Sequence, residues 1–178
     1  MRAYQPAFGY VRAYLPALGY AYVGFAVAAM ALAGEHPRTA TAVFALGGFA
    51  YLWFLGGLRA RLIRYDPDGF FAAVVVLGGA SYLPLHATAI ATRDVELAAL
   101  GSPAAATVVV GSSLAALHAR KVPRSFGLAG LVGGVGILGV GTGEAAAHWV
   151  FAGSALWASA LGFMIWVMAS ATWMLANP

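Results

Sequence analysis

The chain has no cysteine and very few charged residues. Charged side chains make up 9% of its 178 residues, with 10 Lys and Arg against 6 Asp and Glu, whereas an ordinary soluble domain has about 25%. The absence of cysteine excludes a disulfide framework, a thiolate metal site and a thiol nucleophile. The low charge content excludes a water-soluble domain of this size, because too few polar side chains remain to cover its surface.

Apolar sequence takes the place of the missing charge. Hydrophobic residues account for 62% of the chain and occur in long runs between short polar segments. A membrane-spanning helix needs about 20 predominantly apolar residues, and about 17 to 25 are tolerated. The sequence therefore predicts one all-α domain over residues 1–178, a polytopic transmembrane helix bundle. Its six spans are expected near residues 14–33, 41–58, 70–90, 103–119, 125–141 and 145–175.

Turn-forming and capping residues set two of these boundaries. The Asp66–Gly69 turn precedes the third span and offers Asp68 as a helix cap. Ser102 as a cap, with Pro103 in the first helical position, predicts the start of the fourth span. Residues 94–100 are then expected to form a surface turn or an interfacial helix.

The basic residues indicate an orientation. With six spans, both termini lie on one side, and 8 of the 10 basic residues fall on that side; only Arg38 and Arg93 fall on the other. Since Lys and Arg accumulate in cytoplasmic loops, we expect both termini to be cytoplasmic in a bacterial inner membrane. The basic residues flank apolar spans and form no single polar face, so the expected partner is the lipid bilayer and not nucleic acid. The eight are Arg2, Arg12, Arg59, Arg61, Arg64, Arg120, Lys121 and Arg124.

Glycine is unusually dense in the fifth predicted span. Each glycine costs about 1 kcal/mol relative to alanine in a water-exposed helix, so packing must offset the cost. Close approach of neighbouring helices is the usual explanation. An alternative keeps residues 139–143 non-helical, with carbonyl groups facing an ion, although the same residues also suit a helix end. We predict a helix-packing role for Gly127, Gly130, Gly133, Gly134, Gly136 and Gly139.

The histidines are the main candidates for chemistry. Glu144 and His148 are four residues apart, so on a helix they share one face and can form a carboxylate–imidazole pair. Together with His86, which is also expected on the outer side, they form a candidate outer polar site for a metal ion or a proton relay. A metal site needs three or four converging ligands, and the spacing leaves both metal and cofactor unknown. Nucleophile and nucleotide-binding motifs are absent, so no catalytic residue is predicted.

Two stretches, residues 51–62 (YLWFLGGLRARL) and residues 117–124 (LHARKVPR), resemble an uncharacterised group of multi-pass membrane proteins from high-GC bacteria, chiefly actinobacteria. In that group a similar run closes the second span, and a basic turn precedes a glycine-rich span. Here Ser125 and Phe126 stand where the group usually has an aromatic residue directly after Pro-Arg. The resemblance covers about residues 41 to 175 and implies an α-helical integral membrane fold with no established activity.

Three classes of function fit these observations. A non-enzymatic subunit that packs in a homo-oligomer or with other membrane subunits is favoured by the short loops and the glycine-rich span. A channel or carrier for a small neutral solute is favoured by the uncharged spans and by a likeness of residues 22–48 to small bacterial amide and urea channels. A metal- or haem-binding redox protein would use His86, Glu144 and His148.

Overall fold

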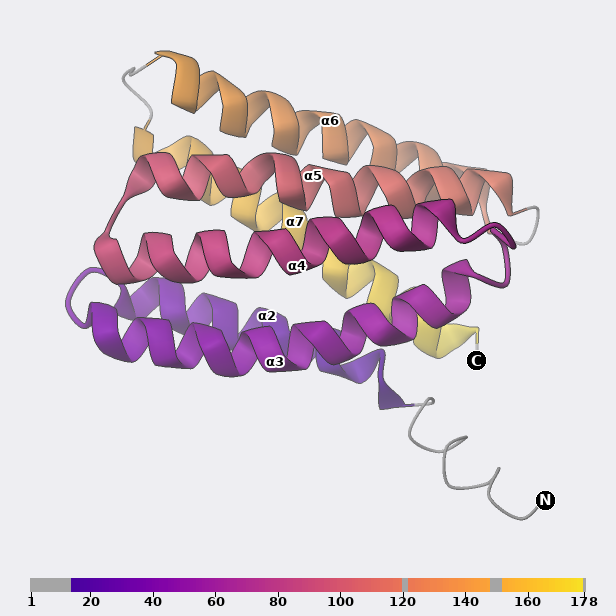
Figure 1. Ribbon diagram of the computed structural model, residues 1–178, viewed down its shortest axis with the longest axis horizontal. Coiled ribbons are helices and arrows are strands. Elements are labelled where there is room, and N and C mark those ends of the chain that lie inside the picture. The colour runs from indigo at the N-terminus through magenta and orange to yellow at the C-terminus, as the bar shows by residue number, and fades with distance from the viewer. Residues whose placement is uncertain (1–13, 120–121, 148–151, 178) are drawn as a thin grey trace.

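The computed structural model describes residues 14–119, 122–147 and 152–177. Within those residues the chain forms six α-helices and no β-strand, which confirms the all-α prediction (Figure 1). The helices are α2 (Ala17–Leu32), α3 (Pro37–Leu62), α4 (Phe70–Thr92), α5 (Val95–His118), α6 (Arg124–Ala147) and α7 (Ala152–Ala176).

Most of these helices are suited to a membrane. Five of them, α3 to α7, are long and apolar enough to cross a bilayer. Helix α2 is apolar but has only 16 residues, or about 24 Å at 1.5 Å per residue, against a hydrocarbon core of about 30 Å. The chain is therefore a multi-pass helix bundle, and the sixth crossing remains a prediction that depends on α2.

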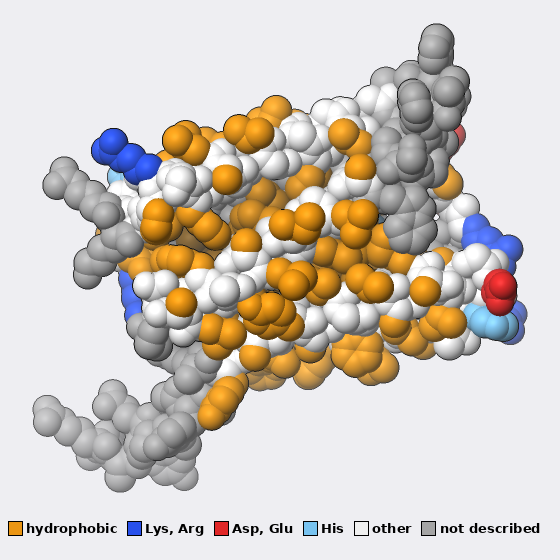
Figure 2. Space-filling model, turned by 180° about the vertical axis from the view of Figure 1, so that it is seen from behind, with side chains coloured by type: hydrophobic (Ala, Val, Ile, Leu, Met, Phe, Trp, Pro, Cys, Tyr) orange, Lys and Arg blue, Asp and Glu red, His pale blue; other side chains and the backbone are white. Residues whose placement is uncertain are grey.

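The outer surface of the bundle agrees with a lipid environment. Figure 2 shows apolar side chains along the face of the bundle and charged side chains gathered at its two ends. Phe49, Leu77, Val132 and Ile165 are each at least 65% exposed. Exposed apolar side chains in such number are unusual on a soluble monomer and are expected where a protein contacts lipid.

Each helix packs against the next one along the chain, and α7 returns to contact α2, α5 and α6. The start of α2 and the end of α7 lie at the same end of the bundle as the α3–α4 and α5–α6 connections (Figure 1). We name this the Arg61 end, and the opposite end, where the α2–α3 and α4–α5 turns lie, the Arg93 end. The six crossings and the end that faces the cytoplasm remain predictions.

The centre of the bundle is aromatic. Tyr22 of α2, Tyr51 of α3, Tyr82 of α4 and Phe163 of α7 are all buried. The ring centroids of Tyr22 and Tyr51 are 4.8 Å apart, and those of Tyr82 and Phe163 are 4.7 Å apart. Because these rings come from four helices, they hold the bundle together at its middle and close its axis there.

The predicted start of the fourth span is wrong. Helix α5 begins at Val95 and contains Pro103 in its interior, so residues 94–100 are not a separate surface segment. Asp94 caps this helix, because its side-chain oxygen accepts a hydrogen bond from the Leu97 amide at 3.0 Å. A proline inside a helix is tolerated in membrane proteins, where neighbouring helices satisfy the backbone groups that it frees.

Ser102 is buried against a neighbouring helix and is not the predicted helix cap. Its hydroxyl oxygen lies 3.0 Å from that of Ser159 on α7, so the two hydroxyls share a hydrogen bond. A serine that bonds across two helices is typical of membrane bundles.

The cap of α4 is also different from the prediction. Asp66, not Asp68, accepts a hydrogen bond from the Phe71 amide, at 2.7 Å. Gly69 at the helix start has φ 70°, a left-handed conformation that glycine adopts readily. Asp66 is two residues further from the helix than Asp68. The turn at Gly69 brings its carboxylate to the Phe71 amide, one of the free amides in the first turn of α4.

Other boundaries differ from the predicted spans by a few residues. Helix α3 extends beyond residues 41–58, because Pro37 suits the first helical turn and Arg59 and Arg61 suit the negative end of the helix dipole. The predicted sixth span, residues 145–175, begins too early, since α6 continues to Ala147 and α7 starts at Ala152.

The glycine-rich segment of α6 is helical throughout. Residues 139–143 are neither a non-helical carbonyl site nor a helix end, because α6 passes through them without a break. The Thr142 hydroxyl donates to the Leu138 carbonyl oxygen at 2.7 Å, one turn earlier in the same helix. The backbone carbonyls here are therefore engaged in the helix and do not face an ion.

The predicted packing glycines fall into two groups. Gly127, Gly130 and Gly134 face α5, where an added Cβ would come within 3.0 Å of Leu117, Ser113 and Val110 respectively. Around Gly133, Gly136 and Gly139, no described atom lies within 4 Å of an added Cβ. The first group therefore lets α5 and α6 approach closely, and the second faces away from the other described helices.

Candidate functional site

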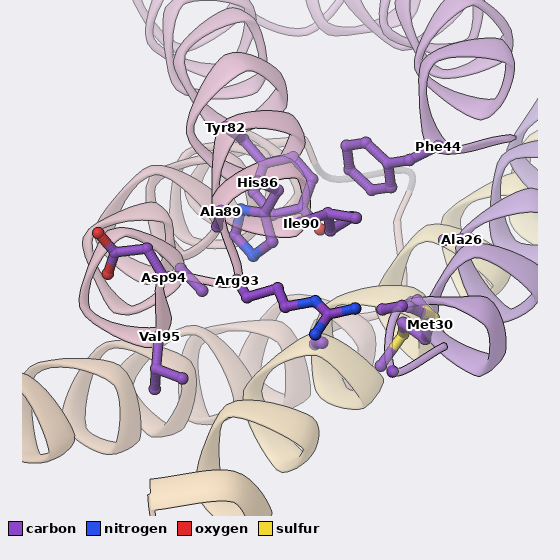
Figure 3. Close-up of a pocket in the computed structure, with 15 residues that line it drawn as sticks. Ala26, Met30, Phe44, Tyr82, His86, Ala89, Ile90, Arg93, Asp94 and Val95 are labelled. Atoms are coloured by element: carbon purple, nitrogen blue, oxygen red, sulfur yellow. The ribbon is translucent and has the colours of Figure 1, made fainter. Parts of the chain in front are cut away.

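A cavity of about 370 Å³ opens at the Arg93 end of the bundle (Figure 3). Helices α2, α3, α4, α5 and α7 all contribute to it. Its walls are mainly apolar: Met30 comes from α2, Phe44 from α3, Ile90 from α4, Ala98 from α5 and Met164 from α7. Tyr82, one ring of the aromatic centre, lines its floor.

Two aromatic residues on one face of α4 supply polar atoms inside the cavity. Tyr82 and His86 are four residues apart, and their ring centroids are 4.1 Å apart. The Tyr82 oxygen accepts a hydrogen bond from the Tyr22 hydroxyl at 2.9 Å, so Tyr82 keeps its own proton free to donate. Figure 3 shows both rings turned toward the cavity.

The position of His86 depends on a glycine of α5. A Cβ at Gly101 would overlap the imidazole ring, so the missing side chain provides the slot in which one edge of the ring is buried. Nδ1 lies in this slot without a hydrogen bond to the described residues. The imidazole is therefore held at a fixed place in the cavity wall.

Arg93 and Asp94 stand at the mouth of the cavity. Arg93 ends α4 with φ 57° and ψ 32°, and it is the one non-glycine residue with positive φ in the part of the chain that the structure describes. In Figure 3 its side chain extends across the mouth toward Met30, whereas the Asp94 side chain points away. The carboxylate of Asp94 caps α5, so of the two charged side chains at the mouth, Arg93 is the one that extends over the opening.

The structure places one of the three residues of the predicted outer polar site. His86 lines the cavity. Glu144 lies on α6 with its side chain outside the described part of the chain, and His148 lies outside the described residues altogether. Among residues 14–119, 122–147 and 152–177, no three acidic or histidine side chains gather as a metal site would require.

Sequence reasoning missed Tyr82, Arg93 and Gly101. The spacing of Tyr82 and His86 was visible, since residues four apart share a helix face. Arg93 was considered only as a charge that sets the topology, so its place at the cavity was not recognised. Gly101 could not be recognised because it lies on α5, whereas the His86 ring that it accommodates lies on α4.

A second cavity, of about 20 Å³, lies toward the Arg61 end. Trp166 and Ser170 line it, and their side-chain Nε1 and Oγ atoms are buried with no hydrogen-bond partner among the described residues. Arg61 also lines it, but its guanidinium donates to the carbonyl oxygens of Met174 and Asn177 at the end of α7. A space of this size fits a single water molecule and no larger ligand.

Comparisons with protein-family models, with curated proteins and with solved structures find no match to this chain.

Proposed function

We propose that this membrane protein binds a small, mainly apolar molecule in the cavity at the Arg93 end. The observation that supports the proposal is the cavity itself, whose volume of about 370 Å³ falls within the roughly 300–1,000 Å³ typical of ligand sites. Apolar walls with a few convergent polar groups are the usual composition of such sites. Tyr82 and His86 provide those groups here.

Among the three classes of function, this geometry favours a carrier, and its solute would be small and mainly apolar with one polar or charged group. Packing as a subunit does not by itself require a cavity of this size, whereas binding of a small ligand does. The buried rings of Tyr22, Tyr51, Tyr82 and Phe163 close the cavity toward the Arg61 end. Transport would therefore require a second conformation in which these rings separate.

The distribution of charge supports a particular orientation. Arg59, Arg61, Arg64 and Arg124 lie at the Arg61 end, and Arg38 and Arg93 at the other. By the positive-inside rule, the cavity would open toward the outer face of a bacterial inner membrane. A ligand would then enter from outside the cell or from the outer leaflet.

A metal- or haem-binding redox role has less support than ligand binding. That role needs Glu144 and His148 beside His86. Of these three side chains, the structure describes only that of His86. Packing as a subunit in a homo-oligomer remains compatible with ligand binding, because Gly133, Gly136 and Gly139 lie on an open face of α6.

A variant that fills the cavity tests the proposal. Ala98 lines the cavity, whereas Ala91, on α4, is exposed and does not. The full chain in lipid nanodiscs would be screened by thermal shift against small apolar molecules carrying one hydrogen-bonding group. We expect stabilising compounds to be found and to lose their effect in Ala98→Phe but not in the control Ala91→Phe. Compounds that shift both variants equally, or no stabilising compound at all, would contradict the proposal.

A further inference from the structure

We propose that the occupant of the cavity is a small single-chain carboxylate, with its apolar body against the cavity walls and its anionic group at Arg93. This inference rests on the proposed ligand-binding function and specifies the chemical class of the ligand.

The mouth presents a cation that has no ion-pair partner among the side chains that the structure describes. Arg93 is exposed and makes no ion pair with the described residues, among which the one salt bridge, at 4.0 Å, joins His36 and Glu35. The neighbouring carboxylate, Asp94, accepts a hydrogen bond from the Leu97 amide, and its side chain points away from Arg93. An anion at the mouth would therefore meet Arg93 without first displacing Asp94.

The backbone at Arg93 is unusual for an arginine. Residues that end a helix in the left-handed conformation are most often glycine or asparagine, because other side chains adopt it rarely. Here the position carries a long cationic side chain that reaches across the mouth. A sparsely populated conformation at the edge of a cavity is a reason to suspect function, and in this case it directs the guanidinium over the opening.

The space behind Arg93 suits an apolar chain. Tyr82 at the floor and Arg93 at the mouth are eleven residues apart on α4, or about 16 Å along the helix axis. A cavity of about 370 Å³ lies near the lower end of the roughly 300–1,000 Å³ typical of small-ligand sites. Its length and volume therefore suit a single-chain carboxylic acid of about ten carbons.

The chemistry at the mouth discriminates between head groups. Guanidinium binds carboxylate through two parallel charge-assisted hydrogen bonds, which are about twice as strong as neutral ones. A neutral alcohol of the same length would form weaker bonds, and a cationic amphiphile would be repelled by Arg93. Selectivity for an anion therefore arises from attraction and from repulsion together.

The test uses the full chain in phosphatidylcholine nanodiscs and radiolabelled decanoate as the probe. Decanol and decyltrimethylammonium, which have the same chain length, serve as competitors. We expect saturable decanoate binding, weaker competition by decanol and none by the cation. Arg93→Gln should weaken decanoate binding roughly tenfold or more, as expected for loss of a hydrogen-bonded charge.

Two further variants control this experiment. Arg93→Gly removes the side chain and still allows the left-handed backbone. It should weaken decanoate binding as much as Arg93→Gln does, and it replaces that variant if Arg93→Gln folds poorly. Arg38→Gln removes an exposed arginine of the same end that does not line the cavity, and it should leave binding unchanged.

The outcomes separate this inference from the proposed function. If decanol competes with radiolabelled decanoate as well as unlabelled decanoate does, and neither Arg93 variant changes decanoate binding, the carboxylate assignment is wrong. The proposal that the cavity binds a ligand would then still stand. Absence of any saturable binding, with Ala98→Phe behaving like the parent chain toward every compound screened, would overturn both. Phosphatidylglycerol added to the bilayer tests a lipid source: if it abolishes decanoate binding, a lipid occupies the mouth and the small-acid assignment is wrong.

Discussion

Asp66 and Asp68 stand in one turn, and only Asp66 stabilises a helix. Its side-chain oxygen accepts a hydrogen bond from the Phe71 amide at 2.7 Å, and the residue is only 9% exposed. Asp68 is exposed. The two carboxylates therefore form a matched pair for measuring the contribution of the cap.

We expect Asp66→Ala to destabilise the protein by about 1 kcal/mol, the usual contribution of a helix cap. In a chain of this size such a change lowers the thermal unfolding midpoint by about 2–4 °C. Asp68→Ala is the control and should leave the midpoint unchanged. Differential scanning fluorimetry in mild detergent measures both, and equal midpoints for the two variants would show that the Asp66 hydrogen bond does not stabilise α4.

Ser170 offers a second residue-scale prediction, in the cavity of about 20 Å³. If one water molecule bridges the Ser170 hydroxyl and the Trp166 indole, both groups are satisfied, and removing one partner is unfavourable. We therefore expect Ser170→Ala to lower the unfolding midpoint measured in the same assay. A higher midpoint would contradict this, because removal of a hydroxyl that has no partner at all relieves an unfavourable burial.

The residues of the candidate site were only partly predictable from sequence. His86 was recognised because a histidine in an uncharged span is conspicuous. Tyr82 and Arg93 acquire their roles only when α2, α3, α5 and α7 enclose the space beside α4, and Gly101 matters only because α5 meets the His86 ring. Such convergence of helices distant in sequence leaves no trace in local spacing.

At the scale of elements, helix identity was easier to predict than helix ends. Long apolar runs specify helices in a membrane, because no other structure satisfies the backbone there except a closed barrel. The start of α5 was misplaced because Ser102 and Pro103 form a plausible helix start, whereas Asp94 provides a cap earlier in the chain. Ser102 serves instead as a contact with Ser159 of α7, which only the tertiary structure determines.

The two groups of glycines on α6 allow a matched test of helix packing. Gly130 and Gly134 lie against α5, whereas Gly133 and Gly136 face open space. A leucine at Gly130 or Gly134 would push α6 away from Ser113 or Val110, so we expect a clear fall in the unfolding midpoint. In detergent that keeps the chain monomeric, Gly133→Leu and Gly136→Leu should unfold at the parent temperature. If all four variants unfold together, close packing of α5 and α6 does not depend on these glycines.

The same variants test the predicted homo-oligomer. The open face that carries Gly133, Gly136 and Gly139 is the face on which a second copy would pack closely. Size-exclusion chromatography with light scattering should then show a smaller assembly for Gly133→Leu than for Gly130→Leu. A parent chain that is already monomeric would rule out this oligomer.

At the scale of the whole molecule, the distribution of charge predicts the topology. Both ends of the described chain lie at the Arg61 end, and 8 of the 10 basic residues fall on that side of the six-span arrangement. We expect a reporter active only in the cytoplasm to function after Pro178, and one active only outside the cell to function at Arg93. Outside activity after Pro178 would contradict the six-span arrangement with cytoplasmic termini.

Photolabelling of the cavity tests the ligand-binding proposal most directly. Two probes are used, each a ten-carbon chain with a photoreactive diazirine at its far end. One has a carboxylate head group and the other an alcohol, so that labelling of the cavity does not depend on the charge of Arg93. After irradiation in nanodiscs, we expect peptide mapping to find adducts on cavity residues such as Met30, Ile90 and Met164, and excess unlabelled probe to suppress them. Adducts confined to outward-facing residues such as Leu77, Val132 and Ile165, without suppression by competitor, would contradict a binding site in this cavity.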